Sequence, residues 1–168
     1  SSTSDTEILA HLIKRASGRM IDRVCTSLSQ LEGAFAFLIL MDHALFIARD
    51  RYGLRPLSIG QMSDGAYVVA SETCAFEVIG AKFIRDVQPG EVIRIKDDQL
   101  KSTFYTKNTT HHLCAMEYIY FSRPDSHLEK INVHTTRKQA GKILYEEAPV
   151  QDIDVVIGVP DSRSEEHT

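Results

Sequence analysis

The spacing of apolar residues predicts two helices at the start of the chain and strands after them. Residues 6–15 and 18–31 place their apolar side chains three and four positions apart, which is the pattern of one buried helix face. After Gly33 the period changes: "AFAFLILM" is continuously apolar, and "HALFIARD" follows a polar Asp42-His43 step that suits a hairpin. Both segments are typical of strands buried on at least one face.

Apolar stretches separated by glycine and proline continue the sheet. Strands are predicted in "YGLRPLSIG", "AYVVASE" and "GEVIRIKDDQL", and a short helix in "TCAFEVIG". A longer helix is predicted over 133–147, and "DIDVVIGVP" after it is typical of a buried strand of the parallel type. The polar, threonine-rich stretch "KSTFYTKNTTHH" is the one linker-like segment, so we expect the first domain boundary between residues 101 and 130.

The composition is that of a globular chain with a real core, since 43% of its 168 residues are apolar. A formal net charge of -4 and a pI near 6.0 favour neither nucleic acid nor membrane as a partner, and no apolar run approaches the length of a membrane span. Cys25, Cys74 and Cys114 favour reduced thiols in the cytoplasm over a disulfide framework. The start, "SSTSDTE", has no signal pattern, so we expect the chain to begin mid-protein.

Most polar residues have ordinary structural interpretations. Asp5 precedes the first helix and can cap it, although a carboxylate there could also bind the ammonium group of an amino-acid substrate. The charges, Gly53 and Pro56 of "RDRYGLRPL" predict a tight, salt-bridged turn. The histidines lack the spacing of metal ligands, and Cys25 and Cys74 are predicted to be packed thiols.

Two places favour chemistry over packing. "DVVIGVPDS" runs an apolar strand into Asp161 and Ser162, as open α/β sheets do where a loop binds phosphate. Such a loop can offer backbone donors to a diphosphate and a hydroxyl to a metal ion. Cys114 precedes a strand-like "MEYIYF" and does not lie inside an apolar helix, so a packing role is less evident for it. One cysteine, however, cannot hold a metal by itself.

Taken together and in order, five stretches resemble one enzyme family. "TSDTE", "RDRYGLRPL", "VASETCAFEVIGAKFIRDVQPGEVIRI", "CAMEYIYFSRPDS" and "DVVIGVPDS" resemble segments of the glutamine phosphoribosylpyrophosphate amidotransferases, or amidophosphoribosyltransferases, which commit carbon to purine synthesis. The resemblance covers residues 3–162. "RDRYGLRPL" is also similar to a segment of asparagine synthetase, another class II amidotransferase, so "CAMEYIYFSRPDS" is the discriminating stretch.

The resemblance implies an α+β fold in two parts. Residues 1–112 would be the C-terminal part of a glutaminase domain of the N-terminal-nucleophile type, an incomplete α-β-β-α sandwich. Residues 113–162 would be an inter-domain segment and the start of an α/β phosphoribosyltransferase domain. Residues 163–168, "RSEEHT", depart from the family and resemble translated adapter read-through, so we expect a non-native tail. The intact protein is expected to be cytoplasmic and homo-oligomeric.

The resemblance also implies roles for individual residues. Asp5 would bind the α-amino group of glutamine, and Asp161 and Ser162 would form the pyrophosphate loop. Ser162 would contribute to the Mg²⁺ that phosphoribosylpyrophosphate carries. Cys114 would be the first of four cysteines that hold a [4Fe-4S] cluster, the other three lying beyond residue 168.

No catalytic residue is expected in this chain. In the family the nucleophile is an N-terminal cysteine, which would lie upstream of Ser1, so neither Cys25 nor Cys74 is assigned that role. Two alternatives stay open: another class II amidotransferase such as asparagine synthetase, with an ATP-binding second domain, and a non-catalytic module that keeps the glutaminase scaffold. The missing upstream and downstream sequence would distinguish them.

The implied reaction converts glutamine, phosphoribosylpyrophosphate and water into 5-phosphoribosylamine, glutamate and pyrophosphate. Ammonia from glutamine would have to pass between two domains without meeting bulk water. Tyr118, Tyr120 and Phe121 are candidates for that apolar interface, with an ordinary half-buried strand as the alternative. Arg123 is expected to pair with Asp125 in the turn that follows.

Overall fold

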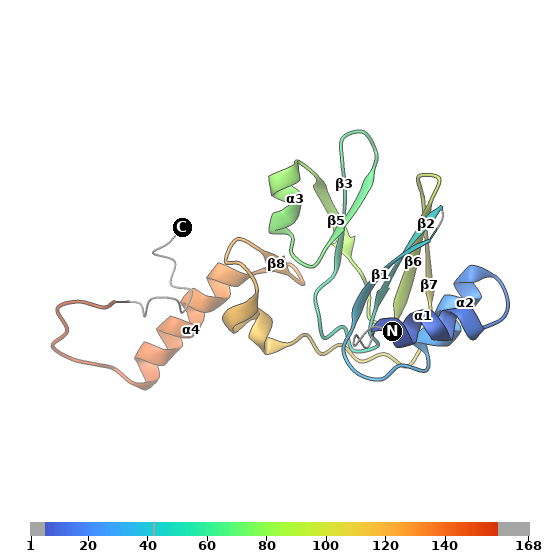
Figure 1. The fold of residues 1–168 in the computed structure, drawn as a ribbon. Helices are drawn as coiled ribbons and strands as arrows, with labels where there is room; N and C mark the ends of the chain where they lie inside the picture. The colour runs from blue at the N-terminus through green and yellow to red at the C-terminus, as the bar shows by residue number, and fades with distance from the viewer. Residues whose placement is uncertain (1–5, 42, 158–168) are drawn as a thin grey trace.

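The computed structural model describes residues 6–41 and 43–157 (Figure 1). Its first two helices, α1 (Thr6–Arg15) and α2 (Met20–Leu28), confirm the prediction from apolar spacing. Both turn their apolar faces to the same neighbouring sheet, so they cover it as one layer. The apolar side chains that the two helices bury are Leu9, Ile13, Val24 and Leu28.

Within the described residues, four antiparallel strands form the larger sheet in the order β1-β2-β6-β7. The strands are β1 (Ala36–Met41), β2 (Ala44–Arg49), β6 (Glu91–Lys96) and β7 (Gln99–Phe104). Met41 pairs with Ala44, so β1 and β2 form the hairpin that the polar step predicts. Phe46, Ala48 and Val92 pack from this sheet against α1 and α2.

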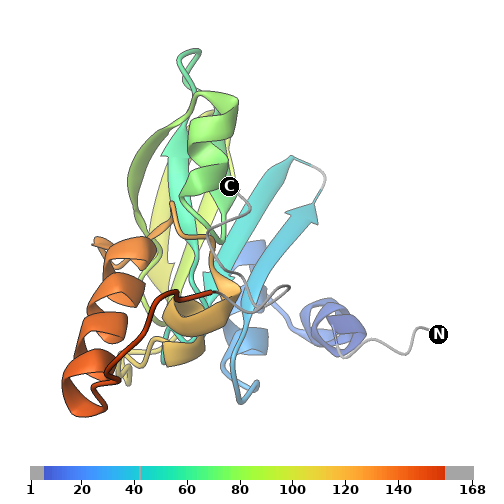
Figure 2. The same cartoon turned by 90° about the vertical axis from the view of Figure 1, so that its left-hand side faces the viewer.

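A smaller sheet, in the order β4-β3-β5, covers the opposite face of the larger one (Figures 1 and 2). Its strands are β3 (Ser58–Gln61), β4 (Tyr67–Ala70) and β5 (Lys82–Asp86). Ile59 of β3 packs with Leu57 and Val87 against Ile47 and Ile93 of the larger sheet. The predicted short helix, α3 (Cys74–Ile79), contacts β4 and β5. The mixed α+β class expected from the sequence is therefore confirmed.

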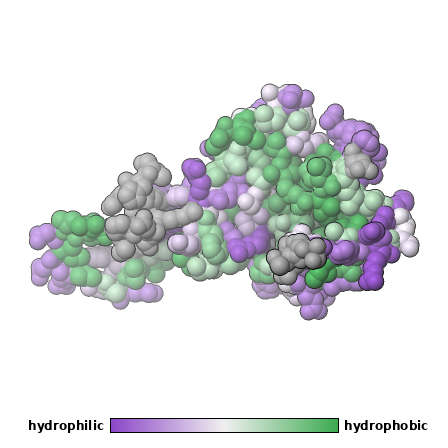
Figure 3. Space-filling view, in the orientation of Figure 1, coloured by the Kyte–Doolittle hydropathy of each residue, from purple (hydrophilic) through white to green (hydrophobic). Residues whose placement is uncertain are grey.

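The outermost strand of the larger sheet, β1, lies beyond the cover of the smaller sheet. Leu38 pairs with Ile47 and Leu40 with Leu45, so these side chains share one face. Ile47 is fully buried there, whereas Leu38 is 53% exposed and Leu40 is 82% exposed. Figure 3 shows hydrophobic surface over these sheets and along the projecting helix near the C-terminus. The described residues thus leave part of an apolar sheet face open.

The segment "MEYIYF" corrects one prediction, because Glu117–Phe121 form a π-helix, η1, and not a strand. A strand needs a neighbouring strand for its backbone hydrogen bonds, and no strand in the described part of the chain pairs with this segment. Two short strands, β8 (His127–Leu128) and β9 (Ile131–Asn132), pair with each other after it. The helix predicted over 133–147 is confirmed as α4 (Val133–Glu147), with the side chain of Asn132 as its N-cap.

Three further predictions from the hydrophobic pattern were wrong or incomplete. In "DIDVVIGVP" the described residues, 152–157, are exposed and form no strand, since no other strand lies beside them. The first part of "KSTFYTKNTTHH" is not a linker, because Lys101 to Phe104 belong to β7. A tight turn at Asp97 and Asp98, both with positive φ, divides β6 from β7 where one strand was expected. Strand β5 was not predicted.

Candidate functional site

Hydrogen bonds from within and outside the loop hold "RDRYGLRP", residues 49–56, in place, and we call it the arginine loop. The buried carboxylate of Asp50 accepts hydrogen bonds from the backbone N–H of Tyr52 at 2.8 Å, of Leu54 at 3.2 Å and of Phe35 at 3.3 Å. Gly53 has φ +61°, and a Cβ there would lie 2.9 Å from Pro89. The predicted tight turn is therefore confirmed, and Asp50 holds it closed.

Arg49 lies at the base of this loop and is 1% exposed. Its guanidinium donates to the carbonyl oxygens of Arg55 at 2.8 Å, Gly53 at 2.8 Å and Val87 at 2.7 Å. It also lies 3.3 Å from a carboxylate oxygen of Glu129. Three carbonyls with no other described donor at these positions thus depend on one planar, five-donor side chain, which is a geometry that lysine cannot reproduce.

Arg55, at the other end of the arginine loop, reaches a second glutamate. Its Nη1 donates to Oε1 of Glu117 at 2.6 Å, and its guanidinium lies 4.9 Å from the ring centroid of Phe121. Glu117 is 5% exposed, and its other carboxylate oxygen accepts a hydrogen bond from the hydroxyl of Ser122 at 2.9 Å. A nearly buried carboxylate in η1 is therefore satisfied by one cation and one hydroxyl.

Backbone hydrogen bonds attach the following segment to the same loop. Thr110 donates to the carbonyl of Arg51 at 3.2 Å, His112 to that of Tyr52 at 2.7 Å, and Cys114 to that of Leu54 at 3.1 Å. The donors are spaced two residues apart, as in an extended chain that runs along one side of the arginine loop. We call residues 108–132 the docked segment. The expected boundary between the glutaminase part, 1–112, and the segment 113–162 therefore lies inside the docked segment.

A second line of contacts fixes the far half of the docked segment near α3. The carboxylate of Glu72 accepts from the backbone N–H of Arg123 at 2.6 Å and from the hydroxyl of Ser126 at 2.9 Å. Thr73 accepts from the backbone N–H of His127 at 2.8 Å. The expected pair of Arg123 with Asp125 is also present, at 3.1 Å, on the surface.

The side chain of Arg137 ties helix α4 to η1. Arg137 donates to the carbonyl of Tyr118 and to that of Ser122, each at 2.7 Å. The hydroxyl of Tyr118 donates in turn to the carbonyl of Leu128 at 2.9 Å, and burial raises the pKa of this phenol. The π-helix is therefore held from both sides, by the arginine loop and by α4.

A separate buried ion pair stabilises the larger sheet. The carboxylate of Glu91, 1% exposed, accepts from Arg85 at 2.7 and 2.9 Å, from the backbone N–H of Gln88 at 2.8 Å and from the hydroxyl of Ser102. Burial alone would raise the pKa of Glu91, but the hydrogen bonds from Arg85 and Ser102 outweigh it and hold the pKa below its ordinary value. This group is structural, because its donors leave it no open side.

Of the predicted site residues, only Cys114 lies in the described part of the chain; Asp5, Asp161 and Ser162, like the tail 163–168, lie outside it. Cys114 is partly exposed at the start of η1, whereas Cys74 is buried and Cys25 is half-buried, as predicted for packed thiols. All three thiols are free. Among the described residues, no group of three or more His, Cys, Asp and Glu side chains could hold a metal ion.

The two glutamates of the docked segment were missed by sequence reasoning. Glu117 had a signal, because a single carboxylate inside the apolar run "CAMEYIYF" needs a partner when that run is buried. Glu129 had none, since its partners Arg49 and His111 are 80 and 18 positions away along the chain. His111 Nε2 lies 3.1 Å from a carboxylate oxygen of Glu129.

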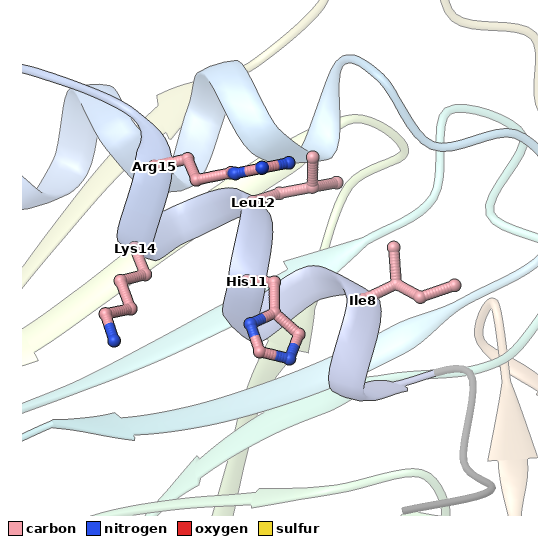
Figure 4. Close-up of a pocket in the computed structure, with 5 residues that line it drawn as sticks. All are labelled: Ile8, His11, Leu12, Lys14 and Arg15. Carbon is pink, nitrogen blue, oxygen red and sulfur yellow. The ribbon is translucent and has the colours of Figure 1, made fainter. Parts of the chain in front are cut away.

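Hollows surround the first turn of α1. Cavities of about 410 and 220 Å³ lie on either side of Thr6 and share β1 as a wall. A more open hollow of about 660 Å³ lies along the outer side of α1. Figure 4 shows Ile8, Leu12 and Arg15 pointing to one side of that helix and His11 and Lys14 to the neighbouring side. Thr6 lines both of the smaller cavities, and it is the first described residue of the chain.

Comparisons with known proteins agree on one kind of enzyme. The family described as "Glutamine amidotransferase domain" matches residues 1–78. The amidophosphoribosyltransferase of Bacillus subtilis (strain 168) is 55% identical over 161 residues, which is 95% of this chain and 33% of that protein. The amidophosphoribosyltransferase of Staphylococcus aureus (strain MRSA252) is 47% identical over 162 residues, covering 96% of this chain and 33% of that protein. The chain is similar to about one third of the length of these amidophosphoribosyltransferases.

A solved structure extends the amidophosphoribosyltransferase match from sequence to fold. The glutamine phosphoribosylpyrophosphate amidotransferase from B. subtilis, complexed with ADP and GMP, superposes with a TM-score of 0.92 at 55% identity. The superposition covers 96% of this chain and 35% of that chain. The chain spans about a third of the length of the curated relatives it matches, and these relatives agree with the resemblance that its motifs indicate.

Proposed function

We propose that the chain is part of a longer polypeptide, called the intact polypeptide below, that acts as an amidophosphoribosyltransferase. It would convert glutamine, phosphoribosylpyrophosphate and water into 5-phosphoribosylamine, glutamate and pyrophosphate. The observation that carries this proposal is 55% identity over 95% of the chain to a protein with that name. We expect a cytoplasmic homo-oligomer with no nucleic-acid or membrane partner, consistent with the net charge of -4. No helix in the described ranges is long and apolar enough to span a bilayer.

The glutamine-using half of this reaction would be assigned to residues 1–112, as part of an α-β-β-α sandwich of the N-terminal-nucleophile type. The stacking of α1 and α2, the larger sheet and the smaller sheet supports this assignment. Asp5 would bind the α-amino group of glutamine, and the hollows beside Thr6 are large enough for such a side chain. The nucleophile would be an upstream cysteine, so we expect no glutaminase activity from residues 1–168 alone.

The transfer half would begin in residues 113–162. Asp161 and Ser162 would bind the pyrophosphate group, and Ser162 would contribute to the Mg²⁺ that enters with phosphoribosylpyrophosphate. Magnesium would shield the negative charge of the leaving pyrophosphate. The exposed apolar residues that precede them, Val155, Val156 and Ile157, support a contact with further parts of the intact polypeptide.

A [4Fe-4S] cluster would be a structural group with Cys114 as one ligand. Cys114 is partly exposed and its backbone N–H donates to the carbonyl of Leu54, so its thiolate could bind a cluster whose other ligands come from outside the described residues. The described residues supply one suitable thiolate and not a set of four, so the other three must come from elsewhere in the intact polypeptide. When bound, the cluster would cross-link distant parts of one chain.

The path of ammonia between the two halves would pass the apolar side of η1. Ile119 is 66% exposed, Tyr120 48% and Phe121 41%. A contiguous group of exposed apolar side chains is typical of a surface that another part of a protein covers. Tyr118 is tied down by its hydroxyl, so Tyr120 and Phe121 are the better candidates for this interface.

The test is a substrate comparison on the intact polypeptide. With glutamine and phosphoribosylpyrophosphate it should release glutamate and pyrophosphate, and replacing phosphoribosylpyrophosphate by ATP with aspartate should give no pyrophosphate. Pyrophosphate formed only from ATP would favour an asparagine synthetase, and glutamate formation in neither case would favour a non-catalytic module. Purified residues 1–168 are the matched control, and they should release no glutamate.

A further inference from the structure

A continuous set of contacts links the arginine loop to α4 through η1. Arg55 donates to one oxygen of Glu117 at 2.6 Å, and the hydroxyl of Ser122 donates to the other at 2.9 Å. The carbonyl of Ser122 accepts from Arg137 at 2.7 Å, and Arg137 lies on α4. We call these four residues the Arg55 relay.

The burial along this relay makes Glu117 its critical member. Glu117 is 5% exposed and Ser122 is 1% exposed, while the side chain of Arg55 is 47% exposed. A buried carboxylate is destabilising unless it is hydrogen-bonded, so the carboxylate of Glu117 holds the side chains of Arg55 and Ser122 in fixed positions. The backbone N–H of Ser122 also donates to the carbonyl of Glu117 at 3.1 Å, which closes the π-helix at the same point.

The rest of α4 has few other attachments to the sheets. Val133, in its first turn, is fully buried, but Ile143 is 44% exposed, Leu144 65% and Tyr145 62%. Figure 1 shows α4 extending away from both sheets, with η1 beside its first half. The angle at which α4 leaves the sheets is therefore fixed mainly by β8, β9 and the Arg55 relay.

We propose that Glu117, Ser122 and Arg137 are positioning residues that fix α4, and the transferase half that follows it, relative to the glutamine-using half. This inference rests on the proposed function, because only a reaction split between two halves needs a fixed path for ammonia. Loosening the relay opens that path to water, so ammonia escapes while each half keeps its own chemistry. The four residues touch no substrate in this account.

The decisive experiment measures two rates in the intact polypeptide: phosphoribosylamine synthesis with glutamine and synthesis with added ammonium. Glu117→Gln keeps the size of the side chain and removes its charge. We expect it to lower the glutamine-to-ammonium ratio about two- to thirtyfold, the range found for residues within coupled networks. Loss of folded protein would lower both rates together and leave the ratio unchanged, so this readout separates positioning from stability.

The matched control is Asp125→Asn, which breaks an exposed arginine–carboxylate pair in the same docked segment without touching the relay. It should leave the ratio unchanged. The double variant Arg55→Gln with Glu117→Gln should lower the ratio by less than the product of the two single effects, because both changes break the contact between Arg55 and Glu117. An unchanged ratio in Glu117→Gln, or an equal loss in Asp125→Asn, overturns the proposal.

Two additions keep the result interpretable. If Glu117→Gln does not fold, Ser122→Ala removes only the hydroxyl of the relay, and an unchanged ratio in that variant also overturns the proposal. Hydrogen exchange of α4 should become faster in either variant, independently of any activity. A wild-type intact polypeptide that makes no phosphoribosylamine from glutamine or ammonium refutes the proposed function, and α4 exchange then decides the relay by itself.

Discussion

Replacing Arg49 by methionine should be among the most destabilising single changes in this chain. The substitution keeps an unbranched side chain of similar length, but it removes the donors to the carbonyls of Arg55, Gly53 and Val87. A buried acceptor that loses its donor costs about 1–3 kcal/mol, so three of them at the lower part of that range cost about 3–6 kcal/mol. That is a large fraction of the roughly 5–15 kcal/mol by which domains are stable.

Glu129 should contribute little to this loss. Its side chain is 30% exposed and also faces His111, and Glu129→Gln keeps an acceptor for Arg49, so this variant should cost less than Arg49→Met. Arg49→Lys should fall between the two variants, because one ammonium cannot serve three separated carbonyls. The order of the three substitutions identifies the carbonyls, and not the ion pair, as the reason that Arg49 is buried.

The assay is urea unfolding of the 168-residue chain, followed by far-ultraviolet circular dichroism because the chain has no tryptophan. With a slope of about 2 kcal/mol per molar urea, Arg49→Met should lower the unfolding midpoint by about 1.5–3 M. The control is Arg94→Met on β6, where the arginine is half-buried, and it should stay within about 0.5 kcal/mol of the wild type. A shift below about 0.3 M for Arg49→Met, or an equal shift in the control, would refute the reasoning.

Three further predictions concern other parts of the chain. Because the pKa of Glu91 is lowered from 4.5 on folding, its charge stabilises the fold above that pH and loses this effect as the pH falls through the lowered value. Glu91→Gln should therefore lose about 1–3 kcal/mol at pH 7, and urea titrations below pH 4 should show the gap closing. In the intact polypeptide, Cys114→Ser should lose iron and sulfide after anaerobic purification, while Cys74→Ser should keep both; full iron in Cys114→Ser would show that it is no ligand. Asp5→Ala should reduce glutamine-dependent synthesis far more than ammonium-dependent synthesis, and equal losses would make Asp5 merely structural.

The sequence predicted those elements whose signal is local. Helical spacing located α1, α2 and α4, and the apolar runs on either side of the Asp42-His43 step located β1 and β2. Each of these segments carries a regular apolar period of its own, and that period indicates the element even in α4, where only Val133 is buried. The motifs indicated a resemblance to amidophosphoribosyltransferases, and the comparisons found relatives with that name.

The elements that were missed depend on partners far away in the chain. "MEYIYF" alternates as a strand would, but without a neighbouring strand it forms η1 around Glu117, whose cation lies 62 positions earlier. β5 is short and its residues Lys82 to Ile84 are exposed, so its only clear determinant is the pairing with β3. A periodic pattern contains no information on such distant pairings.

The central proposal is that the intact polypeptide is an enzyme that passes ammonia from glutamine directly to a second site. The most direct measurement supplies the intact polypeptide with glutamine labelled with nitrogen-15 in its amide group, phosphoribosylpyrophosphate and an excess of unlabelled ammonium at neutral pH. Mass spectrometry of the phosphoribosylamine formed should find the label in most of the product, with one glutamate released for each pyrophosphate. Product that carries the isotope ratio of the bulk ammonium, or glutamate released without pyrophosphate, would contradict the account.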